Sequence, residues 1–387
     1  MKVPIARTQL TKKEFDVIQK PLESGWVVQG PYTHEFEKKF SEFVNVRESI
    51  AVSSCTSALH LSLAALNFKP GDEAIVPAFT WISTANVVEH LGGKVVFCDI
   101  DLSTFNIDIS KIEKKITSKT RVILPVHLFG LAVDMSPIIQ LAKKHNLFVV
   151  EDAACGFGSK YKNIHVGTFG DTGCFSFHPR KAITTGEGGM VTTNNSELAQ
   201  KIRSMRDHGA AISDFQRHHG SRPYLLAEHP YAGYNYRMTD IQASIGSTQM
   251  DRAKSIVSER IKLANIYSNL LDHLDFFQLP KNIDGFQHSY QSFPCLFDKK
   301  NIKLSNIEKI NNCRNIFMDK LENDGVSTRP ATHAVHMLKY YRKKYRIDYN
   351  DFPNAYIANE CSISFPLFNG LTAKEQDYVI NTIKKNL

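Results

Sequence analysis

The sequence predicts an α/β protein in which a large domain with a mostly parallel central sheet precedes a smaller C-terminal α+β domain. Short β-rich runs alternate with helical patterns through the first half of the chain, and this alternation is typical of parallel β-α-β units. The runs are continuously apolar, which indicates strands that helices cover on both faces. The 387 residues suffice for two domains, and we expect residues 1–255, with an N-terminal arm, and residues 256–387.

The elements of the large domain follow in order along the chain. Strands are expected at residues 49–54, 74–79, 94–100, 121–126 and 147–151, with helices at 56–66 and 135–145. After Asp152, strands at 173–178 and 189–193 flank a Gly-rich turn, and a helix follows at 196–207. Residues 209–233 show no period, and loops of this length are usually functional or mobile.

The two ends of the chain contain further elements. A helical region is expected at 239–273, a strand at 289–297, a helix at 306–324 and a short strand at 362–366. Thr372 and Glu375 form a capping-box pattern that opens a final helix. In the N-terminal arm, a helix that begins near Thr33 carries three aromatic side chains at helical spacing, which predicts core contacts for Phe36, Phe40 and Phe43.

The composition excludes several classes of protein. The 47 Lys and Arg exceed the 39 Asp and Glu by only +8, they are scattered, and no nucleic-acid-binding motif is present, so nucleic acid is not an expected partner. No apolar run reaches the roughly 18–20 residues of a membrane span, and the N-terminus lacks an apolar signal core. The seven dispersed cysteines form no CxxC pair and no zinc spacing. We therefore expect a cytoplasmic enzyme with reduced thiols, no membrane partner and no metal.

The first candidate site is the run of small hydroxyl residues at 53–57 (SSCTS), where a strand ends and a helix begins. A helix N-terminus offers free N–H groups and a partial positive charge, which suit a phosphate group. A plain Ser or Thr N-cap explains the same residues.

Two further candidates lie at the carboxyl ends of predicted strands, where open α/β sheets bind ligands. Asp152 ends an apolar strand and could hold a cation or a protonated ring nitrogen, or serve as a loop or cap acid. Trp81 follows the strand at 74–79 and could stack on a planar cofactor, or lie in the core.

The fourth candidate is Lys181, which lies between a β-rich run and the Gly-rich turn at 186–189 (GEGG). A lysine shielded from water can lose its proton and attack a carbonyl carbon to form a Schiff base. The four candidates together offer a phosphate cradle, an aromatic plate, an acid for a ring nitrogen and an amine for an aldehyde. Pyridoxal 5′-phosphate requires all of these groups.

At these residues the sequence resembles the DegT/DnrJ/EryC1/StrS family of sugar aminotransferases, which depend on pyridoxal phosphate. The resemblance extends from residues 25–31 (GWVVQGP) to residues 365–368 (FPLF). Its most specific segments are residues 151–154 (EDAA), 176–189 and 233–242 (GYNYRMTDIQ). It implies a type I aminotransferase fold and a homodimer whose active sites lie at the subunit interface.

The resemblance also implies roles for individual residues. Lys181 would form the Schiff base with the cofactor and move the proton, Asp152 would pair with the pyridine nitrogen, and Trp81 would stack on the ring. The phosphate would be held by Thr56, Ser57 and Ser176, and by Asn235 of the neighbouring subunit.

Two positions refine the comparison with the family. Three residues after the acid the family often has Gln or His near the ring oxygen of the cofactor, whereas this chain has Cys155, and a thiol is a weak hydrogen-bond partner. The related sugar 3-dehydratases have His at the lysine position. Lys181 therefore favours transamination.

The resemblance implies transfer of an amino group from glutamate to a nucleotide-linked keto-deoxy sugar, with a 4-keto-6-deoxyhexose as the expected acceptor, for polysaccharide or glycan synthesis. Arg329 is a candidate contact for the donor carboxylate or the sugar diphosphate, and a surface residue in a domain hinge is the alternative. Two other functions stay open: an aminotransferase for a keto-cyclitol or an antibiotic sugar, and a non-catalytic regulatory protein on the same fold.

Overall fold

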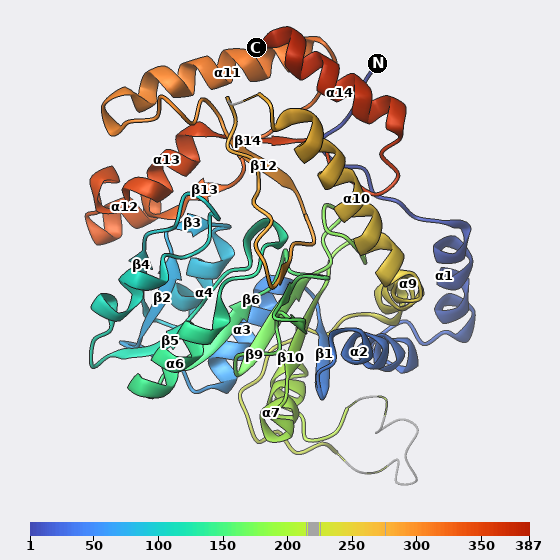
Figure 1. The fold of residues 1–387 in the computed structure, drawn as a ribbon. Helices are drawn as coiled ribbons and strands as arrows, with labels where there is room; N and C mark the ends of the chain where they lie inside the picture. The colour runs from blue at the N-terminus through green and yellow to red at the C-terminus, as the bar shows by residue number, and fades with distance from the viewer. Residues whose placement is uncertain (214, 216–223, 225, 275) are drawn as a thin grey trace.

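A seven-stranded sheet lies at the centre of the computed structural model, which describes residues 1–387 except 214, 216–223, 225 and 275 (Figure 1). Its strands are β1 (Glu48–Val52), β2 (Glu73–Pro77), β4 (Lys94–Cys98), β5 (Thr120–Ile123), β6 (Phe148–Asp152), β9 (Thr172–Ser176) and β10 (Gly189–Thr193). Their order is β1-β10-β9-β6-β5-β2-β4. Only β10 runs against its neighbours. The prediction of a mostly parallel sheet is confirmed.

Side chains from both faces of this sheet are buried in separate apolar clusters. Ile50 and Val52 of β1 pack into one cluster, whereas Ala51 between them packs into the other. This alternation is the pleat of a strand covered on both sides, and it explains why the strands read as continuous apolar runs. The covering helices include α2 (Pro31–Val44), α3 (Cys55–Ala65), α4 (Ser83–His90), α6 (Met135–His145), α7 (Ser196–Arg206), α9 (Asp240–Met250) and α10 (Ala253–Leu271).

The N-terminal arm contains one helix more than the sequence analysis predicted. Helix α1 (Lys12–Ser24) begins at a capping box formed by Thr11 and Glu14, and it contains Pro21, a residue that argues against a helix interior. In α2, Phe36 and Phe40 are fully buried, and Phe43 is partly buried and stacks on Phe157 with ring centroids 4.7 Å apart. The core role predicted for these three side chains is therefore confirmed.

The C-terminal part differs from the predictions in its boundaries. The helical region expected at 239–273 is two helices, α9 and α10, and the strand expected at 289–297 is shortened to β12 (Phe293–Leu296), which pairs with β14 (Ser362–Phe365). Helices α11 (Ile307–Asn323), α12 (Lys339–Tyr345), α13 (Pro353–Cys361) and α14 (Ala373–Asn386) complete this part. The domain division after residue 255 would fall in the first turn of α10, and it stays a prediction.

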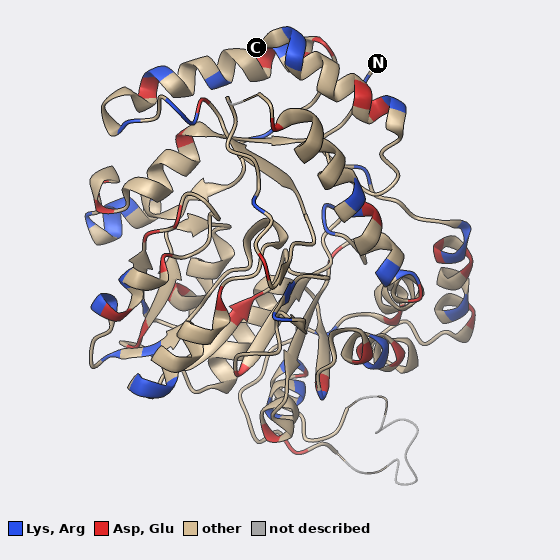
Figure 2. Cartoon of the chain, in the orientation of Figure 1, with Lys and Arg blue, Asp and Glu red and all other residues tan. Residues whose placement is uncertain are grey.

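Charged residues of both signs are interspersed along the helices and loops (Figure 2). Within the described ranges, no helix is both long enough and apolar enough to cross a membrane. The same part of the chain contains no group of three or more His, Cys, Asp or Glu arranged to hold a metal ion.

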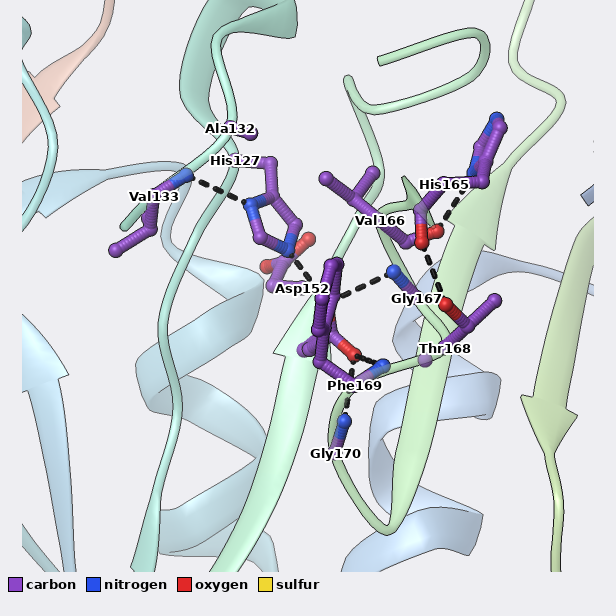
Figure 3. Close-up of polar contacts among 12 residues, drawn as sticks. His127, Ala132, Val133, Asp152, His165, Val166, Gly167, Thr168, Phe169 and Gly170 are labelled. Atoms are coloured by element: carbon purple, nitrogen blue, oxygen red, sulfur yellow. Dashed lines mark hydrogen bonds and ion pairs between the residues drawn. The ribbon is translucent and has the colours of Figure 1, made fainter. Parts of the chain in front are cut away.

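The carboxyl end of β6 is fixed by the fully buried side chain of Glu151. Glu151 Oε1 accepts hydrogen bonds from the backbone N–H groups of Phe169 and Gly170, both at 2.8 Å. Its Oε2 accepts from the N–H of Gly167 at 2.7 Å and lies 2.9 Å from Nε2 of His127 (Figure 3). One carboxylate thereby joins β6 to the loop that precedes β9 and to the segment that follows β5.

His127 orients this end of the sheet in two ways. Its Nδ1 accepts a hydrogen bond from the N–H of Val133 at 3.1 Å, so Nε2 carries the hydrogen that Glu151 accepts. Its backbone N–H donates to the carbonyl oxygen of Asp152 at 3.0 Å, and Asp152 donates to the carbonyl of Pro125 at 2.9 Å. Asp152 is therefore fixed both by its own main-chain hydrogen bonds to His127 and Pro125 and by the side-chain contacts of the preceding residue, Glu151.

Replacing the carboxylate of Glu151 should destabilise the protein. In Glu151→Gln an amide nitrogen would face donors that need an acceptor, and we expect a loss of about 3 kcal/mol in the free energy of unfolding. Urea unfolding measures this loss. Glu113→Gln, at an exposed residue that pairs with Lys144 and His145, is the matched control and should change little. Equal losses in the free energy of unfolding for the two substitutions would contradict the structural role of Glu151.

A second prediction concerns His336, which is fully buried with its ring centroid 4.9 Å from that of Phe352. Burial lowers the pKa of His336 to about 4, against about 6.5 in an unfolded chain. The unfolded chain therefore takes up a proton first as the pH falls, and stability decreases between about pH 6.5 and pH 4. Between pH 7 and pH 5, the free energy of unfolding should fall by about 2 kcal/mol less in His336→Phe than in the wild type, as measured by urea unfolding at both pH values. An equal fall in the free energy of unfolding in the variant and the wild type would show that His336 is not its cause.

Candidate functional site

Lys181 lies on the connection between β9 and β10, at the edge of the sheet where the parallel strands end. Ser176, the last residue of β9, is in register with Gly189, the first of β10, so the segment between them closes on itself. Lys181 is partly buried, and its Nζ lies 3.1 Å from Sγ of Cys155. The structure thus brings together two residues that the sequence analysis selected separately.

Asp152 is 4% exposed at the end of β6. Its Oδ2 accepts a hydrogen bond from Oγ1 of Thr84 at 2.7 Å, and its Oδ1 accepts from the N–H of Ala154 at 3.1 Å. Burial raises the pKa of Asp152, while these two hydrogen bonds and the positive charge of Lys181 act in the opposite direction. Each oxygen accepts a single bond here, so the carboxylate can accept a further donor.

Thr84 is a site residue that sequence reasoning missed. It lies in the first turn of α4, three residues after Trp81, and its hydroxyl contacts the Asp152 carboxylate from a strand-to-helix turn far away in the sequence. The short spacing from Trp81 was the available signal. A threonine in a first helical turn is common, however, and nothing local indicates its partner.

The start of α3 carries the predicted hydroxyl cluster. Ser54 is the N-cap and accepts from the N–H of Ser57 at 3.0 Å, so the capping interpretation is confirmed. Ser57 Oγ also lies 2.9 Å from Oγ of Ser53. Thr56 Oγ1 donates to Oγ of Ser83 at 3.0 Å, which connects this cluster to the start of α4. Whether the cluster also binds a phosphate group stays a prediction.

Gly189 lies directly against the start of α3. A Cβ built on Gly189 would come within 2.5 Å of the backbone of Ser54, so only glycine allows this approach. Ser176, paired with Gly189, accepts a long hydrogen bond of 3.4 Å from the N–H of His178. The hydroxyl cluster and Ser176 therefore lie at the same edge of the sheet.

Trp81 is 54% exposed, so the alternative of a core tryptophan is wrong. It follows the short strand β3 (Phe79–Thr80), which pairs with β13 (His333–Ala334), and its ring centroid is 5.7 Å from that of His333. A half-exposed indole beyond the end of a strand is available to a planar ligand.

Two predicted site residues lie apart from this group. Asn235 is exposed between Tyr234 and Tyr236, whose stacked rings lie 5.1 Å apart. Arg329 is exposed, and its backbone pairs with Ser364. Neither side chain shares a hydrogen bond or an ion pair with Lys181 in the part of the chain that the structure describes. The aperiodic segment predicted at 209–233 lies partly outside the described residues.

Comparisons with known proteins agree with one another. A model of the DegT/DnrJ/EryC1/StrS aminotransferase family matches residues 8–384. GDP-perosamine synthase of Escherichia coli O157:H7 is 38% identical over 384 residues, which cover 99% of this chain and 98% of the relative. Spore coat polysaccharide biosynthesis protein SpsC of Bacillus subtilis is 34% identical, with 99% and 96% covered.

A solved structure extends the agreement to the fold. The putative sugar aminotransferase Spr1654 from Streptococcus pneumoniae, in its PLP form, matches with a TM-score of 0.91 at 28% identity, covering 100% of this chain and 98% of the other. The prediction of a type I aminotransferase fold is confirmed, and so are those of an enzyme and of pyridoxal phosphate as its cofactor. Since the family model spans nearly the whole chain, the protein belongs to the DegT/DnrJ/EryC1/StrS aminotransferase family, as a sugar aminotransferase that depends on pyridoxal phosphate.

Proposed function

We propose that this sugar aminotransferase moves an amino group from glutamate to a nucleotide-linked keto-deoxy sugar, a 4-keto-6-deoxyhexose, for polysaccharide or glycan biosynthesis. The observation that carries the proposal is the partly buried Lys181 on the edge of the sheet where the buried carboxylate of Asp152 also lies. The name of a relative 38% identical, GDP-perosamine synthase, supports a nucleotide-linked substrate.

The residues present fit pyridoxal phosphate. Asp152 is a buried acid that can accept one more donor, as a protonated ring nitrogen requires. The hydroxyl groups of Thr56, Ser57 and Ser176 and the positive end of α3 would hold the phosphate. Trp81 would cover one face of the ring. When bound, the cofactor supplies an electron sink for the carbanion next to the transferred nitrogen.

The chain itself supplies proton transfer and positioning. Lys181 Nζ would carry the proton at the reacting carbon in both halves of the reaction, since a primary amine can act as a base and then as an acid. Asp152 would keep a proton on the ring nitrogen, because its ionised form is stabilised by Thr84 and Ala154. Cys155, 3.1 Å from Lys181 Nζ, would face the ring oxygen in place of a stronger hydrogen-bond partner.

We also propose a homodimer with shared active sites. Asn235 would reach the phosphate of the partner's cofactor, and the exposure of its side chain supports this role. Arg329, exposed next to β14, is proposed to contact the sugar diphosphate or the donor carboxylate. A keto-cyclitol or an antibiotic sugar is the alternative acceptor, and mass spectrometry of the product distinguishes them.

Lys181→Ala should abolish turnover, with a decrease in kcat of at least about a thousandfold, because the variant has no amine at the reacting position. The wild type with pyridoxal phosphate should show a cofactor band that bleaches with glutamate, and borohydride should leave an adduct on the peptide containing Lys181. Lys162→Ala, at an exposed lysine outside the site, should behave like the wild type. Full activity of Lys181→Ala would refute the proposal, and a band indifferent to glutamate would exclude glutamate as donor.

Thr84→Val should move the acidic limb of the pH–rate profile to higher pH. The Thr84 hydrogen bond holds the pKa of Asp152 down, so its loss raises that pKa, and the carboxylate protonates at a higher pH as acid is added. We expect a decrease in kcat of about tenfold near neutral pH. Ser110→Ala, on the exposed start of α5 (Ile109–Ile112), is the control. An unshifted limb would show that Thr84 does not tune Asp152.

A further inference from the structure

The short strand β13 brings the C-terminal part of the chain to Trp81. It pairs antiparallel with β3, with His333 opposite Thr80 and Ala334 opposite Phe79 (Figure 1). Phe79 and Ala334 are buried, whereas His333 and Trp81, the residue that follows β3, are exposed. The pairing therefore places an exposed imidazole next to an exposed indole.

The rings of His333 and Trp81 are in contact. Their centroids are 5.7 Å apart and their planes are inclined by 38°, and aromatic pairs attract each other at separations of about 4.5–7 Å. Within the described residues the indole N–H of Trp81 has no hydrogen-bond partner, so the orientation of this exposed side chain depends on ring contacts such as this one. The imidazole thus restricts the rotamers that the indole can adopt.

The main chain that carries His333 is held from two sides. The N–H of Val335 donates to the carbonyl oxygen of Ala78, just before β3, at 2.8 Å. The N–H of Ala334 donates to Oδ1 of Asn359, in α13, at 2.9 Å. These bonds fix the backbone of His333 relative to β3, and hence relative to the indole that follows that strand.

The turn that carries Trp81 also contacts the buried acid of the site. Oγ1 of Thr84 lies 3.1 Å from the carbonyl oxygen of Trp81 and 2.7 Å from Oδ2 of Asp152. The indole and the carboxylate are therefore attached to the same turn of the chain. In the proposed function both contact one flat ring, Asp152 at its nitrogen and Trp81 at one face, so the orientation of the indole decides whether the two contacts are made together.

We propose that His333 is a positioning residue for the cofactor site: its ring holds the indole of Trp81 in the orientation that covers the ring of pyridoxal phosphate. The inference rests on the proposed function, because it uses the role given there to Trp81. An exposed indole without this support would populate several rotamers. Cofactor binding would then cost the conformational entropy of ordering it.

The two tryptophans of the chain, Trp26 and Trp81, allow a direct test. In a Trp26→Phe background, energy transfer from the excited indole to the bound cofactor depends on the distance and orientation of Trp81 alone. His333→Ala should weaken this transfer and raise the Kd of pyridoxal phosphate about fivefold, because the contact between the two rings is lost. His333→Phe keeps an aromatic ring and should restore both values. His273→Ala, which removes an exposed histidine beyond the end of α10, is the matched control and should behave like the wild type.

A double-mutant cycle separates positioning from a general loss of structure. In a Trp81→Ala background, His333→Ala should have no further effect on the Kd, because a residue that acts through the indole has nothing left to orient. Thermal unfolding verifies that each variant is folded, and the induced circular dichroism of the cofactor band repeats the comparison with Trp26 in place.

Three results would overturn the proposal. The first is an unchanged Kd and unchanged energy transfer in folded His333→Ala. The second is an equal loss in His333→Phe, since the effect would then not depend on an aromatic ring, and the third is an additive effect in the Trp81→Ala background. Absence of any cofactor band in the wild type would overturn the proposed function and this inference together, whereas a normal band that is indifferent to His333 overturns the inference alone.

Discussion

The burial of one carboxylate at the end of β6 constrains the edge of the sheet where the site lies. Glu151 accepts three backbone N–H groups of the loop before β9 and the Nε2–H of His127. A buried charge is tolerated only when such donors surround it. The arrangement therefore fixes two loops and β6 relative to each other, and this network also positions Asp152, the next residue.

The two neighbouring acids at the end of β6 differ in how many donors surround their oxygens. Glu151 faces donors on all sides and is a structural group. Asp152 points to the other face of the same strand, has one hydrogen bond to each oxygen, and retains capacity for a cation. Alternation along a strand separates the two roles at adjacent positions. Lys181, whose Nζ lies 3.1 Å from Sγ of Cys155, belongs to this second environment.

The sequence predicted the parts of the molecule whose signals are local. Continuous apolar runs located the sheet strands within one to three residues, and the ends of those strands located Asp152, Trp81 and Lys181. The sequence analysis did not predict helix α1, which contains an internal proline, nor the short helices α12 and α13. The sequence analysis missed Thr84 and His127 for another reason: each contacts a partner distant in sequence, and no spacing rule reveals a contact that only the folded chain creates. The two-domain division and the individual site roles remain predictions.

The reversed direction of β10 within the sheet determines where the chain carries Lys181. Because β10 begins beside the end of β9, the segment with Lys181 connects two antiparallel strands, and its two ends are held together by the pairing of Ser176 with Gly189. A crossover helix would have carried the chain to the far edge of the sheet, whereas the hairpin returns it to the same edge. Lys181 is thus carried by a connection, residues 177–188, whose two ends are paired with each other. Changes of length in other loops of the α/β framework leave the paired ends of this connection, and hence the attachment of Lys181, in place.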